Sequence, residues 1–166
     1  MIRWENRPVE IANLINPSFC AFLIHEMIKG YEEKSEYDCG ISYELLFLTL
    51  PILLHKPTKE KLPRSIRSYM HTWLQSNPEV RIGYAKRARE LVPYTKEATK
   101  FLTARDLLII NNDGSLSTSS KRLRLNMDRE VNLYLTDYQA KAKLLGKWFA
   151  VTGTSSTIYT MWGISP

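Results

Sequence analysis

The sequence has few of the residues that build reactive or ligand-binding motifs. It contains 2 cysteines, Cys20 and Cys39, whose spacing fits no zinc motif, and we expect both thiols to be reduced. The 7 glycines stand singly, which leaves no glycine-rich phosphate loop and argues against nucleotide binding by this chain alone. From the sequence we therefore expect no cofactor.

The 3 histidines are also poorly placed for chemistry. His25, His55 and His71 are scattered, and none has a carboxylate or cysteine at the helical or turn spacing of a metal site. The sequence has no nucleophile elbow. We predict a protein that binds rather than an enzyme. The alternative is a small hydrolase or nuclease that uses one of these histidines with an Asp or Glu.

Long hydrophobic runs are absent as well. No stretch approaches the roughly 20 apolar residues of a membrane-spanning helix, and "MIRWENRPVE" lacks the features of a signal peptide, so we expect a cytoplasmic protein with no membrane partner. A length of 166 residues with 44% hydrophobic content suits one compact domain. We divide this single domain, residues 1–166, into an N-terminal helical part (1–55), a winged-helix-like part (56–127) and a C-terminal helix with a docking tail (128–166).

Apolar residues recur mostly at helical spacing, which predicts a mainly α fold. Pro51 is expected to kink or split one helix, and Pro93 to end or bend another. Residues 56–64 are predicted to be a polar connection, and Ser65 to cap the helix that follows it. The tail around Trp162 is too apolar to be free, so it should dock as a short helical segment. The helices are expected over about 8–14, 17–34, 42–55, 65–76, 77–93, 94–103 and 128–152.

One segment departs from this helical pattern. In "LLIINNDGSLSTS", residues 107–119, two alternating arms flank an Asn-Asp-Gly turn, which predicts a β-hairpin. Leu108, Ile110 and Leu116 are expected to face the core. A hairpin directly after the last helix of a helical pair is the order of a winged helix-turn-helix, so the fold class is mainly α (α+β) with a winged-helix-like hairpin.

The charge balance is basic, with a formal net charge of +6. Such a balance keeps a nucleic-acid or acidic-protein partner open, although exposed basic residues are also ordinary surface. Two clusters, one within the predicted helix of residues 77–93 and one after the hairpin, are candidates for phosphate contacts. They comprise Arg81, Lys86, Arg87, Arg89, Lys121, Arg122 and Arg124.

Four strings spread over nearly the whole chain carry a family resemblance. They are "WENRPVEIANLINPSFCAFLIHEMIKGY", "LTLPILLHKPTKEKLPR", "NPEVRIGYAKRARELVPYTKEA" and "LGKWFAVTGTSSTIYTMWGISP". Together they resemble the middle component of bacterial three-component ABC ATPase systems, the group that includes the small third subunit of Lamassu-type anti-phage defence. The resemblance implies a non-enzymatic accessory subunit that acts with an SMC- or Rad50-like ATPase and a nuclease-like effector.

An adaptor of this kind needs surfaces for its partners. We predict that the kinked helix of residues 42–55 and aromatic residues near both ends of the chain form apolar patches that partner subunits cover. The competing hypothesis is DNA binding, through the complex or directly, and it predicts an affinity that falls steeply with salt concentration. The candidate interface residues are Trp4, Arg7, Tyr159, Met161 and Trp162.

Overall fold

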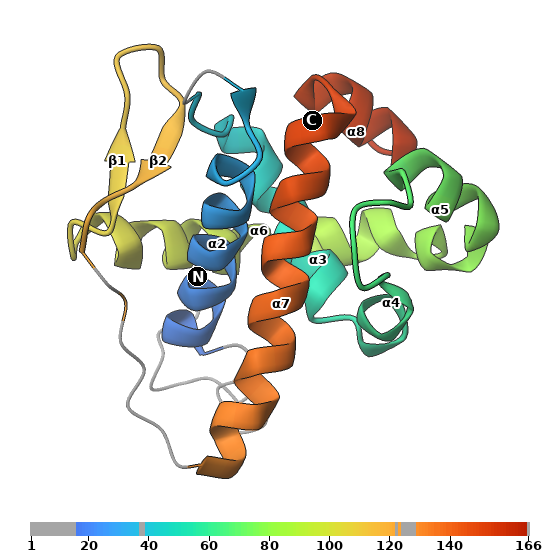
Figure 1. Ribbon diagram of the computed structural model, residues 1–166, viewed down its shortest axis with the longest axis horizontal. Helices are drawn as coiled ribbons and strands as arrows, with labels where there is room; N and C mark the ends of the chain where they lie inside the picture. Colours follow the sequence, from blue (N-terminus) through green and yellow to red (C-terminus); the bar gives the residue numbers. More distant parts are fainter. Residues whose placement is uncertain (1–15, 37–38, 122, 124–128, 166) are drawn as a thin grey trace.

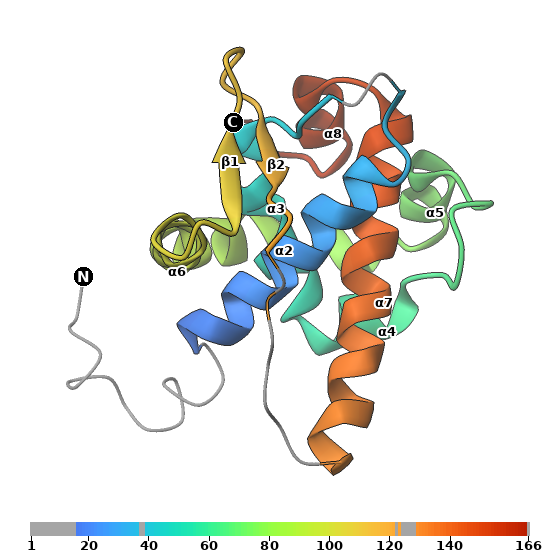
Figure 2. The same cartoon turned by 60° about the vertical axis from the view of Figure 1, so that its left-hand side comes forward.

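The computed structural model describes residues 16–36, 39–121, 123 and 129–165, and in the last range it describes side chains from residue 134 onward. The predicted short helix of residues 8–14 lies outside these ranges. The fold class is mainly helical with a small antiparallel hairpin, as predicted. Two helices, α2 (Pro17–Glu32) and α7 (Arg129–Thr152), run side by side through the middle of the molecule, and the others pack around them (Figures 1 and 2).

The start of α2 follows from its sequence. Asn16 caps the helix, because its side-chain oxygen accepts a hydrogen bond from the main-chain N–H of Ser18 at 2.8 Å. Pro17 occupies the first helical position, where its missing N–H costs nothing. The helix from Cys20 to Ile28 is buried, so this element carries much of the core. Its predicted range, 17–34, is confirmed to within two residues.

Two glycines allow α2 and α7 to approach closely. A Cβ atom built on Gly146 of α7 would lie 1.9 Å from the carbonyl oxygen of Met27, and one built on Gly30 of α2 would lie 2.2 Å from that of Lys143. Real side chains never come this near to backbone atoms, so each helix presents a glycine at the point where the other crosses it. At this contact, which we call the α2–α7 seam, the backbones of the two helices pack directly against each other around Gly30 and Gly146.

The structure corrects the prediction for residues 42–64. A short 3₁₀ helix, η3 (Tyr43–Leu45), leads into α3 (Leu46–Leu53), which contains Pro51 and ends only two residues after it. The expected polar connection is a helix, α4 (Lys56–Lys61), since its proline stands in the first turn, where proline is tolerated. Lys59 of α4 is buried against α7, where its ammonium group lies 2.5 Å from the carboxylate of Asp137.

The helix predicted to start at Ser65 begins later, as α5 (Met70–Ser76). The indole N–H of Trp148, on α7, donates to the main-chain carbonyl of Ser68 at 2.8 Å. That carbonyl therefore serves a tertiary contact instead of a helical hydrogen bond. Ser65 is therefore not a helix cap, because a tertiary contact holds the segment between Ser65 and Met70 outside the helix.

Of the two helices predicted over 77–93 and 94–103, the end at Thr103 is confirmed, whereas the start at residue 77 and the break at Pro93 are wrong. The first residues of the range 77–93 form a separate 3₁₀ turn, η4 (Pro78–Arg81). Gly83, in the left-handed conformation with a φ of 67°, separates this turn from the next helix. One continuous helix, α6 (Tyr84–Thr103), follows and passes through Pro93. Pro93 is exposed, and we attribute the survival of the helix to its packing on α2 and α3, which outweighs the lost hydrogen bond.

The predicted hairpin is confirmed. Strand β1 (Leu108–Ile110) pairs antiparallel with β2 (Leu116–Thr118), and Leu116 also bridges to Ile41 on its other side. Leu108 and Leu116 are buried as expected. Ile110 is not, with 66% of its surface exposed, although it lies on the same face of β1 as Leu108, because it stands directly before the turn, at the end of the strand away from α6. The hairpin follows α6 directly and rests on α2 (Figure 2).

A carboxylate fastens the hairpin to α2. Glu32 accepts hydrogen bonds from the main-chain N–H of Thr118 at 2.6 Å and from its hydroxyl at 2.5 Å. We expect Glu32→Ala to destabilise the protein by about 2 kcal/mol, since it leaves a half-buried N–H without its acceptor. Thr118→Val, which removes only the hydroxyl, should cost less. Urea unfolding of the two variants and amide exchange at Thr118 measure the effect, and equal stability of wild type and Glu32→Ala would contradict it.

The C-terminal segment docks as predicted. The Thr154 hydroxyl caps α8 (Ser155–Met161), and Trp162, directly after this helix, stacks on Tyr84 of α6 with ring centroids 4.5 Å apart. Trp162 is fully buried, so the tail belongs to the core of the chain itself.

Of the helices among the described residues, none combines the length and hydrophobicity needed to span a bilayer. The predicted range of α7, 128–152, is confirmed to within one residue, and Leu135, Tyr138, Ala142, Leu145 and Phe149 form its buried face while Tyr134 is exposed.

Candidate functional site

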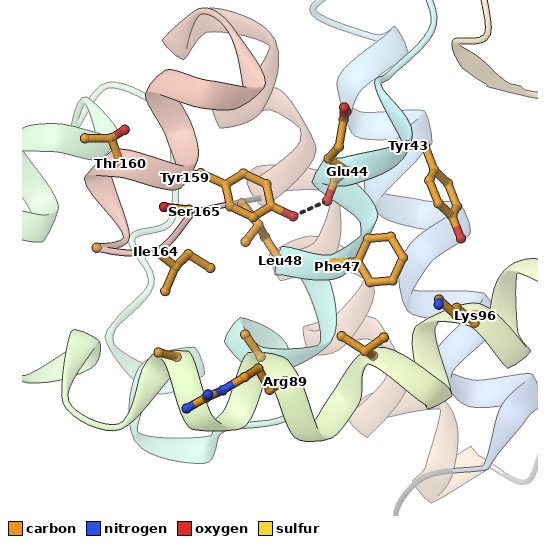
Figure 3. A pocket seen from close by; sticks show the side chains of 14 residues that line it. Tyr43, Glu44, Phe47, Leu48, Arg89, Lys96, Tyr159, Thr160, Ile164 and Ser165 are labelled. Atoms are coloured by element: carbon orange, nitrogen blue, oxygen red, sulfur yellow. Dashed lines mark hydrogen bonds between the residues drawn. The ribbon is translucent and has the colours of Figure 1, made fainter. Parts of the chain in front are cut away.

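A wide groove opens between three elements that are distant in sequence. Tyr43 and Phe47, from η3 and α3, form one wall, the turn after α8 forms the other with Ile164, and α6 forms the floor (Figure 3). The volume is about 950 Å³. The lining is Tyr43, Glu44, Phe47, Leu48, Ala85, Ala88, Arg89, Val92, Lys96, Tyr159, Thr160, Gly163, Ile164 and Ser165.

The groove continues along α6 into a second hollow. This hollow holds about 410 Å³ and shares Tyr43 and Lys96 with the first. Its other lining residues, Thr99, Lys100, Thr103 and Ala104, carry on along α6 to its C-terminus. The two hollows together follow α6 from Ala85 to Ala104, which at 1.5 Å per residue is roughly 28 Å.

One wall is held in place by a polar contact. The hydroxyl of Tyr159 on α8 donates to the main-chain carbonyl of Glu44 in η3 at 2.7 Å, which joins the two walls of the groove (Figure 3). Burial raises the pKa of Tyr159 to about 12, and the nearby Glu44 carboxylate adds to the rise, so the hydroxyl stays protonated and remains a donor at neutral pH. The opposite wall is aromatic, with the Tyr43 and Phe47 rings packed edge to face at 5.1 Å.

The charged groups of the groove are mostly basic. Arg89, Lys96 and Lys100 all rise from α6 and are exposed. At 100° per residue their directions differ by roughly 20° between Arg89 and Lys96 and 40° between Lys96 and Lys100, so they form one stripe. Within the part of the chain that the structure describes, no ion pair joins any of the three to a carboxylate. Among the described lining residues, Glu44 is the acidic one.

The residues predicted to contact nucleic acid do not form one cluster. Arg81 ends η4, and Lys86 and Arg89 lie in the first two turns of α6, where Lys86 is 3.9 Å from Glu90. Lys121 lies at the other end, paired with Asp106 at 2.7 Å. The two groups are about the length of α6 apart. Arg122 and Arg124 are outside the described residues.

Arg87 has a structural role that the sequence did not indicate. Its guanidinium donates to the main-chain carbonyls of Ile82 at 2.7 Å and Val80 at 2.9 Å, and is half-buried beside Tyr84. These bonds satisfy carbonyls at the break between η4 and α6. The guanidinium of Arg87 is therefore engaged within the fold.

The predicted interface residues are also redistributed. Tyr159 and Trp162 are buried within the chain, so neither offers an exposed ring to a partner. Met161 is half-buried, and Trp4 and Arg7 lie outside the described residues. The helix of residues 42–55, expected to be an apolar patch, is buried along α3 by the chain's own packing. The exposed aromatic of this region is Tyr43, on the groove wall.

The histidines stand in separate places. His25 is fully buried on α2, His55 contacts the Thr58 hydroxyl at 2.7 Å, and His71 is exposed on α5, where its ring stacks on Tyr69. Among the described residues, no three His, Cys, Asp or Glu side chains are grouped to hold a metal ion. Cys20 is buried and Cys39 is exposed.

A buried carboxylate on the α2–α7 seam has a strongly shifted pKa. Burial by itself raises the pKa of Glu26, but His25 at 3.5 Å, Gln139 at 2.8 Å and Lys29 at 3.3 Å outweigh it and bring the pKa down to about 2. Gln139 belongs to α7, so this carboxylate links the two helices. Its role is structural, since the seam encloses it.

This shift predicts an acid-sensitive fold. Because the folded pKa lies below the unfolded one, Glu26 stabilises the protein above about pH 4.5, and that contribution is lost as the pH falls towards 2. We expect the loss to be on the order of 2 to 3 kcal/mol. Urea midpoints measured from pH 7 to pH 2.5 should fall more steeply for wild type than for Glu26→Gln. Parallel curves for the two proteins would contradict the assignment.

Fold and groove together define a small, mainly helical domain with one hairpin and an open, basic-rimmed groove. The chain belongs to the family of ABC-three component (ABC-3C) system Middle Component 3, whose model matches residues 4–166. The resemblance to ABC-3C middle components seen in the sequence is thereby confirmed. No curated protein and no solved structure matches the chain.

Proposed function

We propose that this chain is a non-catalytic accessory subunit that bridges an SMC- or Rad50-like ABC ATPase and a nuclease-like effector in a cytoplasmic defence complex of Lamassu type, directed against phage or plasmid DNA. The match of residues 4–166 to the middle component of ABC-three component systems carries this proposal. A middle component acts beside other components of its system, so recognition of proteins is the central requirement. The Lamassu assignment extends the family match and rests on the sequence resemblance.

The groove supports a binding role. It is open, its walls come from three elements, and it combines aromatic and aliphatic lining with a basic rim, which is the composition of protein interfaces. Single apolar side chains are exposed elsewhere, with Tyr69 before α5, Ile82 after η4 and Ile110 on the hairpin.

A non-catalytic role is consistent with the placement of the histidines. His25 is sealed in the core, and His55 and His71 belong to different elements, each engaged with a neighbouring side chain. Replacement of all three histidines should therefore leave the function of the complex unchanged, apart from any loss of stability at His25. Loss of function in a stably folded triple variant would favour the hydrolase alternative.

Direct DNA binding is the second candidate, favoured by the net charge of +6 and by the exposed Arg81, Lys86 and Arg89 at one end of α6. Such binding would weaken steeply with salt, because phosphate contacts release counterions. A filter-binding series from 50 to 200 mM salt tests it with the purified chain. Absence of binding, or binding insensitive to salt, excludes this candidate.

Co-expression tests the accessory role. The chain is tagged and expressed with its neighbouring genes, and the captured proteins are identified by mass spectrometry. We expect a large ATPase and a second, effector-like subunit to be recovered with it. Recovery of the tagged chain alone, from a lysate that contains the other subunits, would refute the proposed function.

A further inference from the structure

We propose that the groove along α6 receives an acidic amphipathic helix from a partner subunit of the complex. This inference rests on the proposed function and adds the chemistry of the docking segment. It starts from the juxtaposition of an apolar channel, lined by Phe47, Val92 and Ile164, and the basic stripe of Arg89, Lys96 and Lys100.

The shape of the groove suits a helix. The two hollows share Tyr43 and Lys96 and run continuously along α6, over roughly 28 Å. A helix of about 18 residues has this length, and its apolar residues at i, i+3, i+4 and i+7 would meet the lining side chains. Small side chains on the floor, Ala85 and Ala88, leave room for it to approach α6.

The charges select the chemistry of that helix. Arg89, Lys96 and Lys100 are exposed and have no carboxylate partner among the described residues, so their charges are available to a binding partner. Three like charges along one edge repel each other and attract an acidic flank. Aspartate and glutamate residues beside the apolar stripe of the partner helix would supply it.

Nucleic acid fits the groove less well. A phosphate backbone has no apolar stripe to match Tyr43, Phe47 and Ile164, and burying those side chains is the main gain that the groove offers. A protein helix satisfies both the lining and the rim. The groove variants described next also report on nucleic acid.

The test compares two double variants in the co-expression assay. Lys96→Glu with Lys100→Glu reverses the stripe, and Lys34→Glu with Lys56→Glu makes the same change in net charge at exposed positions that do not line the groove. We expect the groove variant to recover about tenfold less of one or both partners at unchanged melting temperature, and the control to recover wild-type amounts. Higher salt should weaken capture by wild type, because it screens the charge pairs.

Carbodiimide cross-linking of the wild-type complex gives an independent readout, because it joins amines to carboxylates in direct contact. Links from Lys96 or Lys100 to an acidic helical segment of a partner are expected. Two results would overturn the inference and leave the proposed function intact. In the first, the groove variant captures wild-type amounts of both partners. In the second, it keeps both partners and loses only DNA retention. If wild type captures no partner, the proposed function fails first and this inference falls with it.

Discussion

Gly146→Ala is expected to destabilise the protein by about 3 kcal/mol, and its combination with Gly30→Ala to leave little folded protein. The added methyl group at position 146 would lie 1.9 Å from the carbonyl oxygen of Met27 and 2.6 Å from the N–H nitrogen of Tyr31. These are backbone atoms and cannot swing aside as a side chain would. The helices must separate, and the core residues of α2 lose their packing against α7.

Ala140→Gly is the matched control for this experiment. Ala140 lies on the same helix and is exposed, so its replacement reports the intrinsic helix preference alone, about 1 kcal/mol in favour of alanine. By that preference Gly146→Ala would stabilise α7, and a net loss therefore measures the steric cost at the seam. Urea unfolding at pH 7 gives both values. A Gly146→Ala protein at least as stable as wild type would show that the two backbones are not in contact.

Local signals in the sequence were sufficient for several elements. The Asn16-Pro17 pair sets the start of α2, and the turn ending at Gly114, with its φ of 81°, sets the hairpin. Each signal lies within a few residues of the structure that it specifies. The range of α7 was predicted almost correctly because a 24-residue helix repeats its apolar pattern many times.

Prolines caused the errors in the helix boundaries. Pro57 was predicted to be part of a connection and lies in the first turn of α4, while Pro93 was predicted to end or bend a helix and lies within α6. The sequence around a proline indicates the stability that a helix loses by including it. Whether the helix nevertheless forms depends on the packing of α4 on its neighbours and of α6 on α2 and α3. Packing between distant segments cannot be predicted from the local sequence pattern.

The groove was missed for a related reason. Its basic stripe is regular in the sequence at positions 89, 96 and 100, but it is a stripe only if residues 84–103 form one helix. The predicted break at Pro93 separated Arg89 from Lys96 and Lys100. The aromatic wall comes from Tyr43 and Phe47, about 50 residues away in the chain, and no pattern in one segment indicates contact with another.

Trp162→Ala is expected to cost 3 to 5 kcal/mol, the range for removal of a buried tryptophan side chain. The ring is fully buried, stacks on Tyr84 at 4.5 Å and lies 6.3 Å from Trp73. Its loss removes the anchor of α8, so the tail should undock and the groove should lose the wall that carries Ile164. Thermal melting and limited proteolysis within residues 153–165 measure the two effects.

Trp162→Phe separates packing from hydrogen bonding at the same position. The indole N–H is buried without a hydrogen-bond partner among the described residues, so phenylalanine keeps the stack on Tyr84 and removes an unsatisfied donor. We expect this variant to retain most of the stability of wild type and to keep its partners. If Trp162 were instead an exposed interface residue, as the sequence suggested, Trp162→Ala would lose a partner at an unchanged melting temperature. The two explanations differ in whether stability or partner binding is lost first. If Trp162 is a core residue, its replacement affects binding only after the tail has unfolded.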